Sequence, residues 1–393
     1  MSEFRVDTIT DRDGTGSPNF PNGLTLNGSL PVTNSPTWSE TGTAPSSLAT
    51  QNRIDAYNKG GKNLIINGNM NIHQRSGSSV PNMSTSGYYT ADRWYSDIST
   101  ASTSAVFRQI VDATDFPINS EFHKCLKTTC TTAKASLAVG DFVKVVQKIE
   151  GQNVQVLKKG TSAAETMTIS FWVESSLTGT YVCEVVDLQN SRQISKSYTV
   201  SSSGVWEQKT INFPSDTTGT ISNDSSSRFE VSFWLSAGAT YSGGTLNNSS
   251  WASFTQANRA AGQVNLASNV DNYFALTGVQ LEVGSIANPY EYKSYSEQLS
   301  LCQRYYTSYT ISQDYNDGSN NGVIHRAYTL PVPMRIAPTP SILSQFTYYS
   351  STTPTNVTPT FASSINSVSV ITSGLTSGRG LVGGTFGANA ELT

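Results

Sequence analysis

The sequence predicts a mainly β protein, in which an antiparallel β-sandwich is followed by a small C-terminal β domain. Segments such as TMTISFWVESS and FEVSFWLSAG alternate apolar and polar residues with the period of two that is typical of half-buried strands. Clusters of Gly, Asn and Ser, which favour turns, separate these segments. Only 13% of the 393 residues are charged, about half of the roughly 25% usual in soluble domains. This composition is typical of β-rich folds with long polar loops.

Residues 1–61 form an N-terminal segment without a core of its own. The stretch DRDGTGSPNFPNGLTLNGSLPVTNSP carries Gly, Pro and Asn-Gly at short intervals, and its apolar runs are short. Ordering such a segment costs more free energy than its few apolar contacts return. We therefore expect it to be disordered or to become ordered against another protein. The apolar residues expected to make that contact are Phe4, Val6, Ile9, Phe20 and Leu24.

The sandwich is predicted over residues 62–293. In TMTISFWVESS, Met167, Ile169, Phe171 and Val173 share one face of a strand, and FEVSFWLSAG repeats the pattern. The segments GTYVCEVVDL, VWEQKTINF and NYFALTGVQLEV extend the series. Strands at this spacing, joined by Ser, Asn and Gly loops, predict an antiparallel β-sandwich.

A short helix is predicted where the sandwich ends. Ser294 and Glu297 fit the S-x-x-E capping box, in which each side chain satisfies a free backbone donor at a helix start. The residues expected to form one apolar face of about three helical turns are Tyr295, Leu299, Cys302 and Tyr306. This helix is expected to connect the sandwich to the β domain at residues 294–393.

Two groups of residues are candidates for glycan binding. Sugars stack their apolar faces on Trp or Tyr, while Asn and Asp bind the hydroxyl groups. Tyr315, Asn316 and Asp317 combine these side chains in a predicted loop, and Trp251 lies in the polar stretch NNSSWASFTQANRAAG. The alternative is that such aromatic residues are packing residues of the core.

Several function classes lack their sequence signals. A net charge of −3 and a pI near 5.7 do not suit nucleic-acid binding, which requires a clustered basic surface. Phosphate-binding glycine motifs are absent, and the three histidines are scattered. We therefore expect no catalytic residue, no cofactor and no metal site.

The four cysteines are expected to be buried free thiols, although Cys125 and Cys130 are close enough in sequence to meet across a turn. The segment MSEFRVDTITDRDG lacks the regions of a signal peptide, and no run approaches a membrane span.

Glycoside hydrolysis remains an alternative, because it requires only two suitably spaced carboxyl groups. Glu174, Glu184, Glu207 and Glu230 alternate with apolar residues at strand spacing. Such positions are expected to face solvent, so these residues are not taken as catalytic.

Several segments resemble a family of phage and prophage structural proteins that are usually described as tail-fibre or minor structural proteins. The segments are NLIINGNMNIHQRS, GYYTADRWYSD, VQKIEGQNV, TISFWVESSLTGTY, FALTGVQLEVGSIANPYEYKSYSEQLSLCQRYY and LPVPMRIAPTPSI, in this order. The resemblance covers roughly residues 62–345, and its most specific part is the block that begins GVQLEVGS. The N-terminal stretch SEFRVDTITDRDGTGSPNFPNGLTLNG resembles virion appendage proteins of cyanophages. Residues 346–393 carry no such resemblance.

The resemblance implies a galactose-binding-like jelly-roll sandwich with a small C-terminal β domain. It implies a homotrimeric appendage of the virion, made in the host cytoplasm without a signal peptide. The expected partners are other tail proteins of the adaptor or nozzle type, bound by residues 1–61, and a host surface polysaccharide or receptor, contacted by the C-terminal domain. No nucleic acid and no membrane insertion are expected.

Three functions are therefore considered. The first is a virion structural and attachment protein, a tail fibre or related appendage. The second is a polysaccharide-degrading depolymerase. The third is a purely structural decoration of the head or tail.

Overall fold

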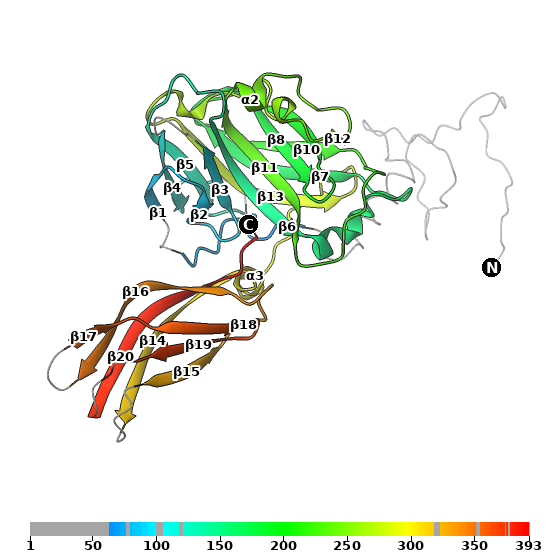
Figure 1. Cartoon of the computed structure of the whole chain (residues 1–393). Coiled ribbons are helices and arrows are strands. Elements are labelled where there is room, and N and C mark those ends of the chain that lie inside the picture. Colours follow the sequence, from blue (N-terminus) through cyan, green and yellow to red (C-terminus); the bar gives the residue numbers. More distant parts are fainter. Residues whose placement is uncertain are drawn as a thin grey trace, which may run out of the picture. The chain divides into compact units, whose positions relative to one another are not determined.

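A computed structural model describes residues 63–75, 79–99, 105–117, 121–317, 323–350, 354–373, 375 and 378–392 (Figure 1). The residues predicted to anchor the chain to other virion proteins, Phe4, Val6, Ile9, Phe20 and Leu24, lie outside these ranges. Their role stays a prediction.

Two antiparallel sheets form a β-sandwich with a jelly-roll arrangement, in which the chain crosses repeatedly from one sheet to the other (Figure 1). The six-stranded sheet has the order β1 (Ser79–Met83), β4 (Val106–Asp112), β5 (Cys125–Thr132), β13 (Tyr273–Val283), β7 (Met167–Ser175) and β10 (Glu207–Phe213). The seven-stranded sheet has the order β12 (Ala252–Ser253), β9 (Arg192–Val200), β8 (Gly179–Asp187), β11 (Ser227–Ala237), β6 (Phe142–Glu150), β3 (Tyr95–Ser99) and β2 (Gly87–Tyr88). Short helices join them: η1 (Gly151–Leu157), α2 (Ala239–Ser242), η2 (Gln256–Asn258) and η3 (Leu266–Ser268).

The core of the sandwich lies between these sheets. The predicted inward face of β7 is confirmed, because Met167, Ile169, Phe171 and Val173 are all at most 2% exposed. The ring of Phe171 meets that of Phe233 on β11 edge-to-face, with centroids 4.9 Å apart. The period-two pattern of the sequence therefore marks the residues through which the sheets pack.

The C-terminal β domain contains two smaller sheets. One has the order β14 (Tyr306–Asp317), β20 (Gly378–Asn389), β16 (Thr339–Ser350) and β17 (Pro354–Val357), and the other β15 (Ile324–Thr329), β19 (Ser367–Thr372) and β18 (Thr360–Ser364). Phe346 and Phe386 are fully buried in its core. A Cβ atom at Gly384 would lie 2.5 Å from the Phe346 ring, so glycine is required there. With the sandwich and a short helix, this domain confirms the predicted fold class.

The helix α3 (Tyr295–Gln303) begins at the predicted residue, because the Ser294 hydroxyl accepts a hydrogen bond from the backbone N–H of Glu297. The predicted apolar face is confirmed at Cys302, which is buried, but is wrong at Tyr295 and Tyr306. Tyr295 is 63% exposed and Tyr306 belongs to strand β14, whereas Gln298 and Cys302 are the buried residues. Gln298 is buried because its side-chain oxygen accepts a hydrogen bond from the backbone N–H of Asn67. The helix therefore contacts the sandwich through a polar side chain.

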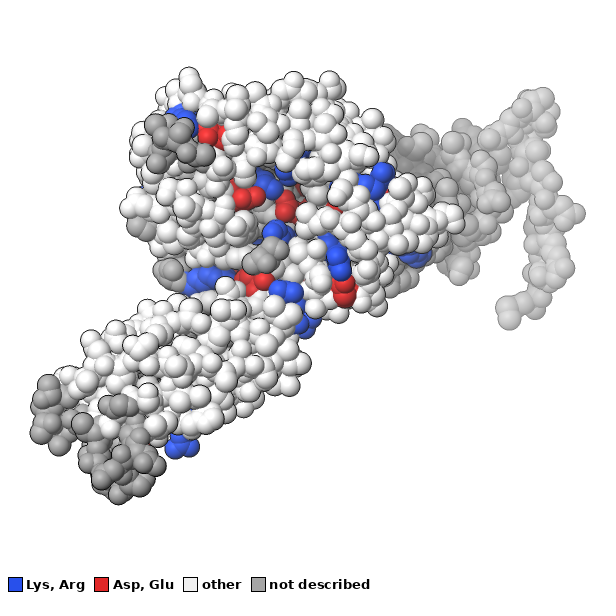
Figure 2. Space-filling model, viewed as in Figure 1, with Lys and Arg blue, Asp and Glu red and all other residues white. Residues whose placement is uncertain are grey.

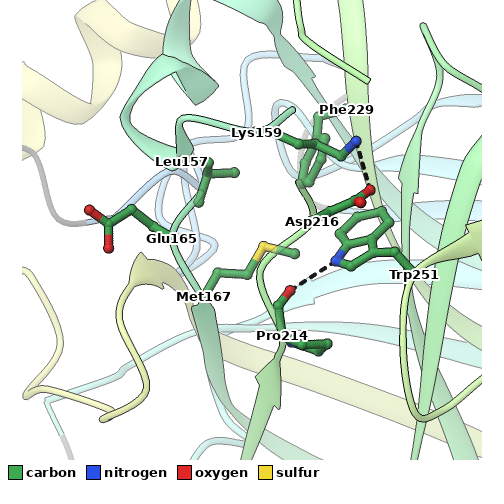
Figure 3. A pocket seen from close by; sticks show the side chains of 8 residues that line it. All are labelled: Leu157, Lys159, Glu165, Met167, Pro214, Asp216, Phe229 and Trp251. Atoms are coloured by element: carbon green, nitrogen blue, oxygen red, sulfur yellow. Dashed lines mark hydrogen bonds and ion pairs between the residues drawn. The ribbon is translucent and has the colours of Figure 1, made fainter. Parts of the chain in front are cut away.

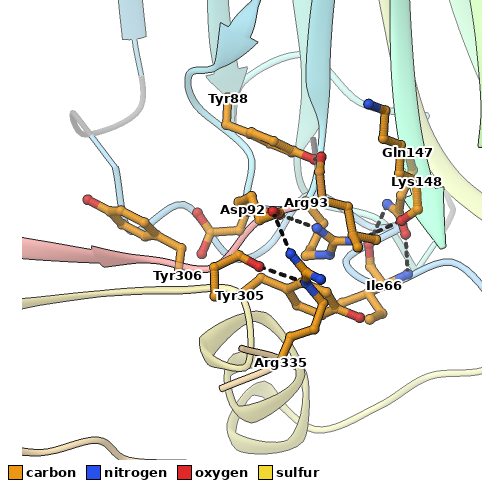
Figure 4. A network of polar contacts seen from close by, with 12 residues as sticks. Ile66, Tyr88, Asp92, Arg93, Gln147, Lys148, Tyr305, Tyr306 and Arg335 are labelled. Atoms are coloured by element: carbon orange, nitrogen blue, oxygen red, sulfur yellow. Dashed lines mark hydrogen bonds and ion pairs between the residues drawn. The ribbon is translucent and has the colours of Figure 1, made fainter. Parts of the chain in front are cut away.

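A buried polar network joins α3 and the last described residues to the sandwich (Figure 4). The Glu391 carboxylate forms ion pairs with Arg75 and with Arg93, and the Arg93 guanidinium lies 3.5 Å from the centre of the Tyr305 ring. The Arg335 side chain donates hydrogen bonds to the backbone carbonyls of Ala390 and Glu391. Residues 390–392 are thus held by paired charges rather than by an apolar contact alone.

Candidate functional site

Charged side chains gather in a hollow over the outer face of the seven-stranded sheet (Figure 2). The strand period explains their position. In β6, Val143 and Val145 point into the core, so Lys144 and Lys148 emerge on the opposite face. The same alternation in β11 places Glu230 beside them. One end of this face is covered by the segment with α2 and η2, where Trp234 packs against Ala260 and Tyr241.

Lys144 and Glu230 form a buried ion pair in this hollow. The Lys144 ammonium lies 2.7 Å from Oε1 of Glu230, which also accepts a hydrogen bond of 2.8 Å from the Ser232 hydroxyl. It lies 3.3 Å from the carboxylate of Asp97 on β3. Burial opposes ionisation of Glu230, but Lys144 and Ser232 outweigh it and lower the pKa of Glu230 to about 2. The Glu230 carboxyl group is therefore ionised at neutral pH.

This pKa predicts a loss of stability in acid. Because the folded-state pKa of Glu230 lies below its usual value of 4.5, the pair contributes stability above 4.5 that is lost as the pH falls toward about 2. The variant Glu230→Gln should lack this part of the acid dependence. Urea unfolding of both proteins across this range measures it, with Glu165→Gln at the more exposed Lys158–Glu165 pair as the control. Parallel curves for Glu230→Gln and the parent protein would contradict the assignment.

A second buried pair lies under the covered end of the hollow. The Arg259 guanidinium contacts both carboxylate oxygens of Glu184 on β8, with Nε–Oε1 at 2.9 Å and Nη2–Oε2 at 2.8 Å. The Trp234 indole N–H donates to the same carboxylate at 3.0 Å. The guanidinium also lies 5.0 Å from the centre of the Trp234 ring. Glu184 is fully buried and its charge is compensated from two sides.

The open part of the hollow combines an aromatic ring with polar groups. Tyr95, Asp97 and Lys148 are each partly exposed there. The Lys148 ammonium lies 5.6 Å from the centre of the Tyr95 ring, which packs on Tyr88 at 4.9 Å. Burial raises the pKa of the Tyr95 phenol, so its hydroxyl remains a neutral donor and acceptor. An aromatic ring, a carboxylate and an ammonium group therefore lie close together at partly exposed positions, and the carboxylate of Asp97 also accepts a hydrogen bond of 3.0 Å from the Ser86 hydroxyl.

The expectation that the strand glutamates face solvent is wrong for most of them. Glu174, Glu184 and Glu230 are at most 6% exposed. Each contacts a side chain that pairs with it, namely Tyr273, Arg259 and Lys144 in that order. A signal for the site was present in the sequence. VKVVQKIE places Lys144 and Lys148 on the face opposite Val143 and Val145, and FEVSFWLSAG places Glu230 opposite Phe229 and Val231, a pattern that also suits cross-strand ion pairs.

The predicted glycan-binding residue Trp251 is 8% exposed, which corrects its expected place on an accessible surface. Its indole N–H donates to the carbonyl of Pro214 at 2.9 Å, and its ring packs on Phe229 (Figure 3). The empty space beside it is about 210 Å³ including its open side, smaller than the roughly 300 Å³ at which ligand pockets begin. The surrounding polar groups are themselves paired, since Lys159 contacts Asp216 at 2.9 Å. This position serves packing.

Tyr315, Asn316 and Asp317 lie in strand β14 rather than in a loop, opposite Gly380, Arg379 and Gly378 of β20. The glycine-rich C-terminal segment forms β20, and its pairing with β14 continues as far as Asp317. The structure does not bring them together with Trp251, which directly precedes strand β12 of the sandwich. Their role in glycan binding stays a prediction.

Other kinds of site were sought in the described residues. No group of three or more His, Cys, Asp or Glu side chains there is placed to hold a metal ion. In the same ranges, no helix is long and apolar enough to cross a membrane. All four cysteines are buried free thiols, as predicted.

Comparisons with known proteins give no family. No family model matches the chain, and no curated protein matches it. Among solved structures, the enzymatically active domain of bacteriophage CBA120 tailspike protein 4 is similar over 56% of this chain and 21% of its own, at 12% identity and a TM-score of 0.31. The module TmCBM61, solved with β-1,4-galactotriose, is similar over 56% of this chain and 99% of its own, at 8% identity and a TM-score of 0.29. Likenesses this low carry no argument about function.

Proposed function

We propose that this chain is a structural protein of a phage virion, of the tail-fibre or related appendage type, and that its sandwich binds host surface glycans in the hollow over the seven-stranded sheet. The virion role rests on the resemblance of residues 62–345 to phage structural proteins. In this proposal residues 1–61 dock on other tail proteins, and three copies assemble into the appendage.

The observation that carries glycan binding is the open part of the hollow. A sugar ring packs its C–H face on an aromatic ring while charged and polar groups bind its hydroxyls. Tyr95, Asp97 and Lys148 supply these groups, and the buried pairs beneath them hold the strands that carry them. The sequence placed this role on the C-terminal domain, but the described residues support the sandwich better.

The chemistry of the hollow favours binding over hydrolysis. A glycosidase needs one protonated carboxyl group and a second carboxylate about 5–9.5 Å away. Glu230 is held as an anion by Lys144, and Glu184 is held by Arg259 and Trp234. We therefore propose that the protein is not an enzyme.

The test is binding of the full chain to a panel of extracted bacterial capsular polysaccharides and lipopolysaccharides. Tyr95→Ala and Lys148→Ala should each weaken the binding at least about tenfold, which corresponds to about 1.4 kcal/mol. Tyr292→Ala and Lys158→Ala change the same residue types at exposed positions and should leave it unchanged.

Three other outcomes would contradict parts of the proposal. Loss of binding only in Tyr315→Ala would place the site on the C-terminal domain. Release of reducing ends from a polysaccharide would indicate a depolymerase. Absence of binding to the whole panel and to intact host cells would favour a purely structural decoration.

A further inference from the structure

A second cluster of charged side chains lies on the outer face of the six-stranded sheet, away from the hollow. Lys127 on β5, Ala275 on β13 and Glu174 on β7 form one row across three neighbouring strands, because Ala275 is the register partner of both other residues. The small alanine side chain leaves space between the lysine and the glutamate. Asp115, from the segment after β4, enters this space.

Asp115 contacts a different group with each of its oxygens. Its Oδ2 lies 2.5 Å from the Lys127 ammonium, and its Oδ1 accepts a hydrogen bond of 3.0 Å from the Trp206 indole N–H. The carboxyl group of Glu174 lies within hydrogen-bonding range of the Asp115 carboxyl. The cluster therefore brings together the amine of Lys127, the carboxyl group of Asp115 and a second carboxyl group, that of Glu174.

The contacts of the second carboxyl group, that of Glu174, favour its protonated form. The Tyr273 hydroxyl donates to Oε1 of Glu174, but no N–H or O–H group of the described residues donates to its buried Oε2. Two carboxylates side by side would repel each other, whereas a protonated Glu174 donates to Asp115. Burial and the neighbouring Asp115 raise the pKa of Glu174 accordingly. Burial also acts on Asp115, but Lys127 and Trp206 outweigh it and lower the pKa of Asp115.

We propose that Lys127 and Asp115 form an intramolecular isopeptide bond, with Glu174 relaying the protons. A carboxyl C–O bond is about 1.2 Å long, so a contact of 2.5 Å from Nζ to Oδ2 puts Nζ within roughly 3.7 Å of the carboxyl carbon. Reacting atoms in a near-attack geometry are about 3–3.5 Å apart. The contact is thus close to the distance at which the C–N bond can form.

The atoms and charges of this step balance without any other reactant. The Lys127 ammonium first passes one proton to the Asp115 carboxylate through Glu174. The Nζ lone pair then attacks the carboxyl carbon of Asp115, and the Trp206 N–H stabilises the negative charge that develops on Oδ1. Glu174 gives its proton to the leaving Oδ2 hydroxyl and takes one from Nζ, so the C–Oδ2 bond breaks and water leaves. An ammonium and a carboxylate have become an amide and one water molecule, and Glu174 is unchanged.

Close contact alone does not define this site, because Lys159 lies equally close to a carboxylate. Its ammonium is 2.5 Å from Oδ2 of Asp187, and Asp216 stands beside it. There, however, the Arg192 guanidinium donates to both oxygens of Asp216, which keeps it an anion that cannot supply a proton. The Lys159–Asp187 pair is therefore an internal control with the same separation and no acid relay.

The bond would join the segment after β4 covalently to β5. It would restrict the unfolded chain in the way that a disulfide does, in a protein whose cysteines are all free thiols. Unlike a disulfide, it would persist under reducing conditions. The inference does not depend on the proposed glycan site, which lies on the other sheet of the sandwich.

Intact mass spectrometry of the purified full chain tests this inference. We expect the parent protein to be lighter than its sequence mass by one water molecule, and a tryptic digest to contain a branched peptide that links Lys127 to Asp115. Lys127→Arg should have its full sequence mass. Glu174→Gln keeps the size of the side chain without the transferable proton and should retain the water. Peptides with Lys159 and Asp187 should be unlinked in every sample.

A parent protein with its full sequence mass and with normal tryptic cleavage after Lys127 would overturn the proposal, provided that circular dichroism shows the sample to be folded. A water loss that persists in Lys127→Arg would overturn it too, because the loss would then arise elsewhere. If Glu174→Gln does not fold, the intact masses of the parent protein and of Lys127→Arg still show whether the bond forms.

Discussion

Replacing Arg259 with methionine is expected to lower the free energy of unfolding by about 3–5 kcal/mol, the usual cost of removing one partner of a buried ion pair. The substitution leaves the fully buried Glu184 carboxylate with the Trp234 N–H and without its cation. Methionine preserves most of the side-chain volume, so the loss reports the charge rather than a cavity. Urea unfolding at neutral pH, followed by tryptophan fluorescence, measures the change.

Two variants control this result. Arg228→Met removes the same kind of side chain from the exposed pair with Asp224, where solvent screens the charges and little loss of stability is expected. The double variant Arg259→Met with Glu184→Met replaces the whole pair by apolar groups and should recover most of the lost stability. If the double variant were less stable than Arg259→Met alone, the unpaired charge would not be the cause of the loss.

The strands were predictable from the sequence because their period of two is a local property. The face of Met167, Ile169, Phe171 and Val173 lies in the core, and the start of the helix at Ser294 follows from a local capping pattern. Both the strand face and the helix start depend only on residues a few positions apart in the chain. They can therefore be recognised in the sequence without knowledge of long-range contacts.

The site was not predictable in the same way, because its residues are paired by contacts between distant parts of the chain. Glu184 is buried only because the segment that contains Arg259 folds over the sheet. Alternation in a strand says that Glu230 and Lys144 share the side opposite the core, but not that this side is covered. Trp251 was misplaced for the same reason, since its partner Pro214 lies on another loop.

Replacing Glu391 with alanine is expected to cost about 3–5 kcal/mol of unfolding free energy, because Arg75 and Arg93 lose their common anion. The side chains of both arginines are at most 8% exposed, so water compensates for little of the loss. Glu297→Ala removes a glutamate from the exposed first turn of α3 and should cost about 1 kcal/mol or less. Guanidinium unfolding of the full chain measures both.

A second measurement shows whether this cost arises where the network lies. The Cys302 thiol is fully buried beside these charges, and burial raises its pKa well above the usual range, so it should react slowly in the parent protein. If the network holds residues 390–392 and α3 in place, Glu391→Ala should speed alkylation of Cys302 but not of Cys183 in the sandwich core. Equal acceleration at both thiols would indicate general unfolding. No acceleration, together with unchanged stability, would show that these buried charges do not hold the C-terminal residues.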